Sequence, residues 1–104
     1  MTVPELTVYW RPGCGYCRRL RRALARQGVR YEAIDIWQDP DARAFVRSVA
    51  NGDETVPTVR LGQEVMVNPG LADLLATIRG QAPQLMGTTS SSSRLPFALW
   101  RRDR

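Results

Sequence analysis

The sequence predicts an α/β fold of three layers with the element order βαβαββα, in which three helices cover a four-stranded mixed sheet. Two short apolar segments flank an amphipathic segment in the first half of the chain. Two further apolar segments, separated by only two residues, follow in the second half. The length of 104 residues allows one compact domain with a core near the lower size limit.

The first half of the chain predicts a βαβ unit. Residues 6–10 (LTVYW) are short, apolar and rich in β-branched and aromatic side chains, which is typical of a buried strand. Apolar residues recur at helical spacing over 15–27, and Gly28 is a suitable helix stop. The apolar residues Tyr31, Ala33, Ile34 and Ile36 predict a second strand. Because a βαβ crossover joins parallel strands, we expect these two strands to be parallel.

A second helix is predicted over 40–50. Asp39 provides the N-cap and Pro40 the first helical position. The apolar residues that follow recur at spacings of three and four, and Asn51-Gly52 ends the pattern.

A hairpin and a last helix complete the predicted fold. The apolar segments 58–61 and 64–67 are separated by Gly62-Gln63, and a two-residue loop that begins with Gly is typical of a type II′ turn. We therefore expect an antiparallel pair that extends the same sheet. Asn68-Pro69 predicts the start of the last helix, with Asn68 as N-cap, and this helix is expected to end near Gly80.

The composition excludes several classes of chemistry. Without His, the chain has neither Ser-His-Asp nor Cys-His catalytic pairs and no His metal ligand. Without Lys, it has no Schiff-base amine and no P-loop lysine. Two Cys cannot complete a four-thiolate zinc site within one chain, so no metal site is expected. The chemistry that remains is the chemistry that the two cysteine sulfurs can carry out.

The net charge of +5 comes from 15 arginines, and their distribution does not favour nucleic-acid binding. A large part of the excess lies in the last twenty residues, and the rest in a dense run (Arg18, Arg19, Arg21, Arg22 and Arg26) that we interpret as a solvated helix face. No export signal or apolar stretch of about 18 residues is found, so we expect a cytoplasmic protein without a membrane segment.

The predicted domain spans residues 1–84. Residues 85–104 contain a Ser-rich linker followed by a basic, aromatic segment, and we expect them to be disordered. A contact of Phe97, Trp100 and the neighbouring arginines with a partner or an anionic surface is the alternative.

The motif Cys14-Gly15-Tyr16-Cys17 lies where the first strand passes into the first helix. A helix N-terminus favours an anion, and the thiolate is the form of cysteine that attacks a disulfide. Arg11 is expected to add positive charge, while Cys17, one turn further on, is expected to face inward and to be close enough for a disulfide. A CxxC in a βαβ context indicates a thioredoxin-like redox motif.

The chain resembles the glutaredoxins and, more closely, the mycoredoxins, which are glutaredoxin-like reductases of bacteria that use mycothiol. The resemblance covers residues 6–80 and rests on a strand, the CxxC motif, a proline segment and the start of the last helix. These are Thr7-Val8-Tyr9, Cys14-Gly15-Tyr16-Cys17, Thr55-Val56-Pro57-Thr58-Val59 and Asn68-Pro69.

The resemblance implies a thioredoxin-like fold and a role for each matching residue. Cys14 corresponds to the nucleophile and Cys17 to the resolving thiol. Val56 precedes what would be a cis-proline, Pro57, and its backbone would pair with the bound thiol substrate like an added strand. Arg11 stands where glutaredoxins often have Lys, and Tyr16 would line the groove for the thiol.

The sequence departs from the glutaredoxin pattern near the last helix. Pro69-Gly70 replaces the usual Gly-Gly pair, and Ala72-Asp73 replaces the Thr-Asp that holds the glutamyl end of glutathione. Gly70 and Asp73 are kept as candidate binding residues. Because Ala72 lacks the hydroxyl of that Thr, the sequence favours mycothiol over glutathione as the small thiol. Gly15 stands where Pro is commoner, and some glutaredoxins with a small residue there hold an iron–sulfur cluster between two chains.

The resemblance therefore implies a monomeric thiol–disulfide oxidoreductase that reduces mixed disulfides between proteins and a small thiol. It would have no tightly bound cofactor, a small thiol (mycothiol or glutathione) as co-substrate, and an NADPH-dependent disulfide reductase as indirect partner. One alternative is an electron carrier recharged by thioredoxin reductase, for example for ribonucleotide reductase. The other is an iron–sulfur scaffold dimer.

Overall fold

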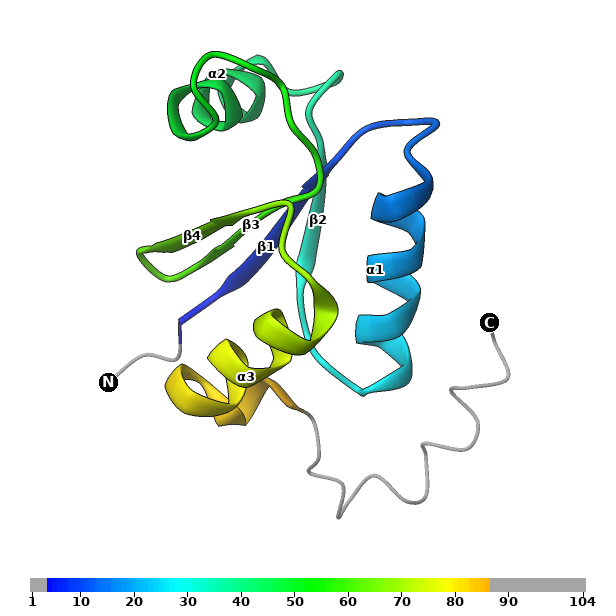
Figure 1. Ribbon diagram of the computed structural model, residues 1–104, viewed down its shortest axis with the longest axis vertical. Coiled ribbons are helices and arrows are strands. Elements are labelled where there is room, and N and C mark those ends of the chain that lie inside the picture. The colour runs from blue at the N-terminus through cyan, green and yellow to red at the C-terminus, as the bar shows by residue number, and fades with distance from the viewer. Residues whose placement is uncertain (1–3, 87–104) are drawn as a thin grey trace.

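The computed structural model describes residues 4–86, and its elements follow the predicted order (Figure 1). The four strands and three α-helices are followed by one short 3-10 helix. In chain order they are β1 (Leu6–Trp10), α1 (Gly15–Arg26), β2 (Glu32–Asp35), α2 (Pro40–Val49), β3 (Thr58–Leu61), β4 (Glu64–Val67), α3 (Leu71–Gln81) and η1 (Pro83–Met86).

The strands form one mixed sheet in the order β2-β1-β3-β4. β1 pairs with β2 in parallel and with β3 antiparallel, and β3 pairs antiparallel with β4. The loop between β3 and β4 has Gly62 at φ +60°, a left-handed conformation that Gly adopts without steric cost. The parallel first pair, the antiparallel hairpin and the thioredoxin-like fold that the sequence predicted are confirmed.

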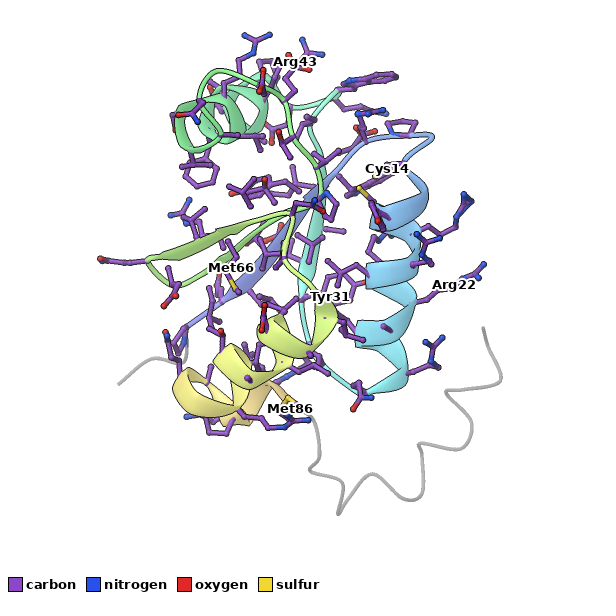
Figure 2. All side chains as sticks on the ribbon, viewed as in Figure 1. Cys14, Arg22, Tyr31, Arg43, Met66 and Met86 are labelled. Atoms are coloured by element: carbon purple, nitrogen blue, oxygen red, sulfur yellow. The ribbon has the colours of Figure 1, made fainter. Side chains whose placement is uncertain are left out.

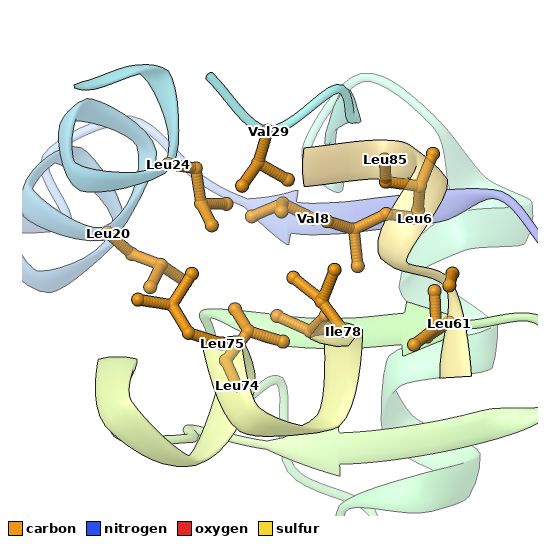
Figure 3. Close-up of a cluster of buried hydrophobic side chains, with 12 residues drawn as sticks. Leu6, Val8, Leu20, Leu24, Val29, Leu61, Leu74, Leu75, Ile78 and Leu85 are labelled. Atoms are coloured by element: carbon orange, nitrogen blue, oxygen red, sulfur yellow. The ribbon is translucent and has the colours of Figure 1, made fainter. Parts of the chain in front are cut away.

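One face of the sheet carries the main hydrophobic core. Alternate residues of β1 and β3 point to this face, so that Leu6 and Val8 lie opposite Leu61 and Val59. They pack against leucines of α1 and α3, as Figure 3 shows. The buried residues of this cluster are Leu6, Val8, Leu20, Leu24, Val29, Val59, Leu61, Leu74, Leu75, Ile78, Ala82 and Leu85.

The other face of the sheet is covered by α2 and has a smaller core. Its buried members are Tyr9, Ile36, Ala42 and Val46, and the ring of Phe45 packs on Tyr9 with 5.2 Å between ring centroids. As predicted, Asp39 caps α2, because its carboxylate accepts hydrogen bonds from the backbone N–H groups of residues 41 and 42. The sheet thus lies between α1 and α3 on one side and α2 on the other (Figure 1).

The predicted start of the last helix is wrong by two residues. α3 begins at Leu71 with Gly70 as its N-cap, and no side chain caps it. Asn68 does not cap this helix because its backbone has a positive φ of 51°, and its N–H donates instead to the carbonyl of Pro57 at 2.8 Å. That bond ties the segment before α3 to the segment before β3, which brings both beside the first turns of α1.

The packed chain extends beyond Pro83, where the helical pattern of the sequence stops. η1 places Leu85 in the main core, and the N–H of Arg30 donates to the carbonyl of Leu85 at 2.9 Å. Of the segment 85–104 that we expected to be disordered, residues 87–104 lie outside the described residues. Within residues 4–86, no helix has both the length and the apolar composition needed to cross a bilayer.

Candidate functional site

Cys14 is the N-cap residue of α1. Its backbone is extended (φ −91°, ψ 107°), and its Sγ accepts a hydrogen bond from the N–H of Cys17 at 3.2 Å. The preceding turn brings the N–H of Cys14 within 3.4 Å of the carbonyl of Arg11, and Gly13 takes the positive φ (+84°) that this turn requires. The N–H and the helix dipole favour a negative charge on the sulfur, which is partly exposed at the start of α1 (Figure 2).

Cys17 has the opposite surroundings, although it lies only one helical turn further on. Its side chain is 1% exposed, as the sequence predicted for an inward-facing thiol. Burial raises the pKa of Cys17 to about 12, and the neighbouring sulfur of Cys14 adds to the shift. Cys17 is thus a buried, protonated thiol at neutral pH, and Cys14 is the more accessible sulfur of the pair.

The Val56-Pro57 segment faces Cys14 from the other side of the site. The Sγ of Cys14 lies 3.9 Å from the carbonyl oxygen of Val56, and the Val56-Pro57 peptide bond is cis, as predicted. β3 begins only at Thr58, whose hydroxyl donates to the carbonyl of Thr55 at 2.8 Å. Val56 thus precedes the paired part of the strand and lies next to the reactive sulfur.

A groove of about 410 Å³ lies between α1, the segment that begins β3 and the start of α3. Its aromatic member is Tyr16, which is 61% exposed and whose ring lies under the guanidinium of Arg19 at 4.8 Å. We call it the Tyr16 groove. Its lining residues are Tyr16, Arg19, Leu20, Ala23, Arg26, Pro57, Asn68, Pro69, Gly70 and Leu71.

A second, smaller pocket of about 170 Å³ includes both cysteines. Three of its seven lining residues are arginines, and none is acidic. We call it the arginine pocket. It is lined by Trp10, Arg11, Gly13, Cys14, Cys17, Arg18 and Arg21.

Most of the residues singled out in the sequence are divided between the two pockets beside α1. Tyr16, Pro57 and Gly70 line the Tyr16 groove, while Arg11 lines the arginine pocket and lies 6.0 Å from the ring of Trp37. Asp73 is different: it lies exposed in the first turn of α3 and is not among the residues that line the groove.

Several residues around the site were missed because the sequence analysis treated the arginine run as a solvated face. Arg19 and Arg26 line the Tyr16 groove, and Arg18 and Arg21 line the arginine pocket. A usable signal was present, since Arg18 and Arg21 follow Cys14 by four and seven residues and such spacings share one helix face. In the part of the chain that the structure describes, His, Cys, Asp and Glu residues form no group of three or more that could hold a metal.

Comparisons with known proteins agree on the type of protein. The pattern that defines the glutaredoxin family matches residues 6–66. A protein of Mycobacterium tuberculosis named as a glutaredoxin is 37% identical over 79 residues, which cover 75% of this chain and 94% of the relative. Mycoredoxin 1 of Corynebacterium glutamicum is 38% identical over 79 residues, with 75% of this chain and 98% of the relative covered.

Solved structures show the same fold. A glutaredoxin from Archaeoglobus fulgidus superposes with a TM-score of 0.63 at 28% identity, covering 74% of this chain and 88% of the other. NrdH-redoxin from Escherichia coli, a glutaredoxin-like protein described as having a thioredoxin-like activity profile, gives a TM-score of 0.59 at 27% identity, with 71% and 93% covered.

Proposed function

Since this chain belongs to the glutaredoxin family, we propose that it reduces mixed disulfides between proteins and a small thiol, with Cys14 as the nucleophile. One observation carries the proposal. The sulfur of Cys14 is partly exposed and accepts the N–H of Cys17 at a helix N-terminus, whereas the sulfur of Cys17 is buried and its pKa is raised to about 12. A partly exposed thiolate beside a protonated thiol is the arrangement that thiol–disulfide exchange requires.

The proposed reaction has two exchange steps. In the first, the thiolate of Cys14 attacks the sulfur of the small thiol in the mixed disulfide. The S–S bond of the substrate breaks, the protein cysteine leaves as a thiolate that takes a proton from water, and Cys14 is joined to the small thiol. In the second, the thiolate of another small-thiol molecule attacks that sulfur, which releases Cys14 and forms the small-thiol disulfide. An NADPH-dependent disulfide reductase then reduces this disulfide.

The Tyr16 groove is the proposed site of the small thiol. Pro57 and Gly70 line it, and Val56, which adjoins Pro57, has its carbonyl oxygen 3.9 Å from the attacking sulfur. The backbone of Val56 lies before the paired part of β3, so it is placed to pair with a bound cysteine in the way an added strand does. The same backbone would align the disulfide with Cys14.

We propose mycothiol as the small thiol. Two observations support it: the 38% identity to Mycoredoxin 1, and Ala72 at the position where the glutaredoxin pattern has the hydroxyl that holds glutathione. The exposed ring of Tyr16 beside the groove also suits a ligand with sugar-like rings, because aromatic side chains combine an apolar face with a polar end.

The test compares two forms of one model protein, one mycothiolated and one glutathionylated, each with its own thiol, NADPH and disulfide reductase. We expect NADPH consumption with the mycothiolated form to be faster by about tenfold or more, which corresponds to about 1.4 kcal/mol of transition-state binding. Equal rates would overturn the choice of thiol but not the reductase activity. No turnover with either form would overturn both.

A dithiol electron carrier recharged by thioredoxin reductase is the second candidate. The similarity to NrdH-redoxin, with its thioredoxin-like activity profile, favours it. The two routes differ in their need for Cys17. The Cys17→Ser variant keeps the small-thiol route, in which only Cys14 forms covalent intermediates. It stops the dithiol route, which ends in a Cys14–Cys17 disulfide. Loss of all turnover in this variant would therefore favour the electron carrier.

We also propose that the protein acts in the cytoplasm as a monomer. Small thiols there keep a CxxC pair reduced, which the proposed cycle requires. A chain truncated after residue 86 tests the role of the tail, because this part contains every residue placed around the site. Unchanged turnover and localisation would show that the tail does not contribute to either.

A further inference from the structure

Positive charge is concentrated in the segment that forms β1 and α1. Residues 6–31 contain seven arginines and no Asp or Glu, whereas the remaining residues up to 86 contain four arginines and nine acidic residues. Within residues 4–86, ion pairs join Arg43 and Arg47 to Glu54, and none involves an arginine of α1. Among the described residues, the arginines near the cysteines therefore lack a carboxylate partner such as the one that Arg43 and Arg47 have.

The arginine pocket is rich in hydrogen-bond donors and short of acceptors. The guanidinium of Arg21 lies over the ring of Trp10 at 4.6 Å from its centroid, so the indole holds the arginine in place. The Nε of Arg21 and the Nε1 of Trp10 are both buried, and neither has a hydrogen-bond acceptor in the part of the chain that the structure describes. Both atoms are covered by the protein, so a ligand in the pocket would meet the terminal nitrogens of the Arg21 guanidinium, which are not among these buried atoms.

This pocket and the Tyr16 groove lie on opposite faces of α1. They share no lining residue, and a period of 3.6 residues places Arg18 and Arg21 on the other side of the helix from Tyr16 and Ala23. A mixed disulfide has two halves, one on each side of the S–S bond that Cys14 attacks. If the small thiol occupies the groove, the protein half can extend toward the arginine pocket.

We propose that the arginine pocket binds a carboxylate of the protein substrate, so that the enzyme favours mixed disulfides whose cysteine is flanked by Asp or Glu. The inference rests on the proposed function, because it names the class of protein that the same site accepts. Arg11, Arg18 and Arg21 supply the positive charge, and Trp10 orients Arg21. Charge-assisted hydrogen bonds from guanidinium groups to a carboxylate are among the stronger polar contacts of proteins.

The experiment compares two peptides with the same small thiol on their single cysteine. In one peptide Asp flanks the cysteine on both sides, and in the other Asn does. We expect kcat/KM to be about fivefold to tenfold higher for the Asp peptide at low salt, with the ratio falling as salt rises. Non-enzymatic reduction by dithiothreitol corrects for the different reactivity of the two disulfides.

Variants that each remove one arginine charge test whether the preference for the Asp peptide comes from this pocket. Arg21→Gln is expected to bring the ratio of the two kcat/KM values close to one. Arg18→Gln, at an exposed position of the same pocket, is expected to lower the ratio as well and serves if the first variant folds poorly. Arg79→Gln removes the same charge from the last turn of α3 and is expected to keep the wild-type ratio.

Two results would overturn the inference. One is equal kcat/KM for the two peptides with the wild-type protein, and the other is an equal fall of the ratio in Arg79→Gln and Arg21→Gln, which would show an effect of net charge rather than of this pocket. Either result leaves the proposed function intact. Failure of the proposed function has a different signature, since neither peptide would then be reduced.

Discussion

The site has a partly exposed part around Cys14, which we call the mouth, and a buried part around Cys17, which we call the floor. One helical turn separates the two cysteines. At the mouth, the sulfur is partly exposed, accepts a backbone N–H and lies beside the carbonyl of Val56. At the floor, the sulfur is 1% exposed and its pKa is raised to about 12. Two identical side chains thus differ in their accessibility, and burial disfavours the anionic form of Cys17.

The proposed function needs one reactive thiol, and this difference indicates how a fold without a histidine would provide it. Cys14 lies at the N-cap position, where backbone N–H groups are unpaired. Cys17 lies on the same face as the apolar residues Leu20 and Leu24, which turn toward the sheet. The helical period therefore puts Cys14 at the end of the helix and Cys17 against the core. The accessible sulfur is then available for the proposed reaction, and the buried sulfur contributes to packing.

The largest expected effect comes from Cys14→Ser. Without the attacking sulfur, mixed-disulfide reduction should fall by on the order of 10³-fold or more, as is usual when a nucleophile is removed. NADPH-coupled turnover measures the loss. The same variant should unfold at nearly the wild-type denaturant midpoint, because Ser is a favourable N-cap residue and can accept the N–H that Cys14 accepts. A large loss of stability would show that the mouth also supports the fold.

Cys17→Ser should show the reverse pattern. A hydroxyl at this buried position loses its hydration, which the Cys14 sulfur and the Arg11 backbone replace only in part, so we expect the free energy of unfolding to fall by roughly 1–3 kcal/mol. Urea unfolding under reducing conditions measures it, with Cys14→Ser as the matched control. If the two variants lose equal stability, Cys17 contributes no more to the packing of the core than Cys14 does, and this part of the comparison is wrong.

Local patterns in the sequence predicted most of the fold and the two cysteines. Asp39-Pro40, the Gly62-Gln63 loop and the CxxC motif each depend on neighbouring residues, and each lies where the sequence predicted it: at a helix start, in a hairpin and at the junction of β1 and α1. The start of α3 was mispredicted because a contact distant in the sequence decides it. Asn68 donates to the carbonyl of Pro57, and no local pattern contains that bond.

The two pockets were less predictable for the same reason. The Tyr16 groove joins residues of α1 to the segments before β3 and α3, which meet only after the sheet has formed. The pairing of Trp10 with Arg21 joins the end of β1 to the middle of α1. A run of arginines on an amphipathic helix is compatible with a solvated face. Only the position of these arginines relative to Cys14 and Trp10 distinguishes the proposed binding surface from such a face.

The pH dependence of stability tests the environment of Cys17 more finely. Because burial raises the pKa of Cys17 to about 12 in the folded chain, above its ordinary value of 9.0, the unfolded chain loses this proton first as the pH rises. The contribution of Cys17 to stability is thus complete below pH 9 and declines between pH 9 and 12, by at most about 1.4 kcal/mol per pH unit. Unfolding of the wild type and of Cys17→Ala should converge over this window. Parallel curves would contradict the raised pKa.

The smallest expected effect concerns Gly15, which lies between the two sulfurs at the first position of α1. A Cβ at this position meets no other atom within 4 Å, and Cys14 already has the extended conformation that a residue before proline prefers. Pro at the first position of a helix loses no intrahelical hydrogen bond.

Gly15→Pro should therefore raise the free energy of unfolding by about 0.4–1 kcal/mol, because it restricts the unfolded chain more than the folded one. Denaturant unfolding of the reduced protein measures the gain, and Gly15→Ala shows how much comes from the loss of glycine freedom alone. A destabilised Gly15→Pro beside a stabilised Gly15→Ala would mean that the N–H of residue 15 takes part in the mouth of the site. The mouth would then depend on a backbone group as well as on the sulfur that the helix end activates.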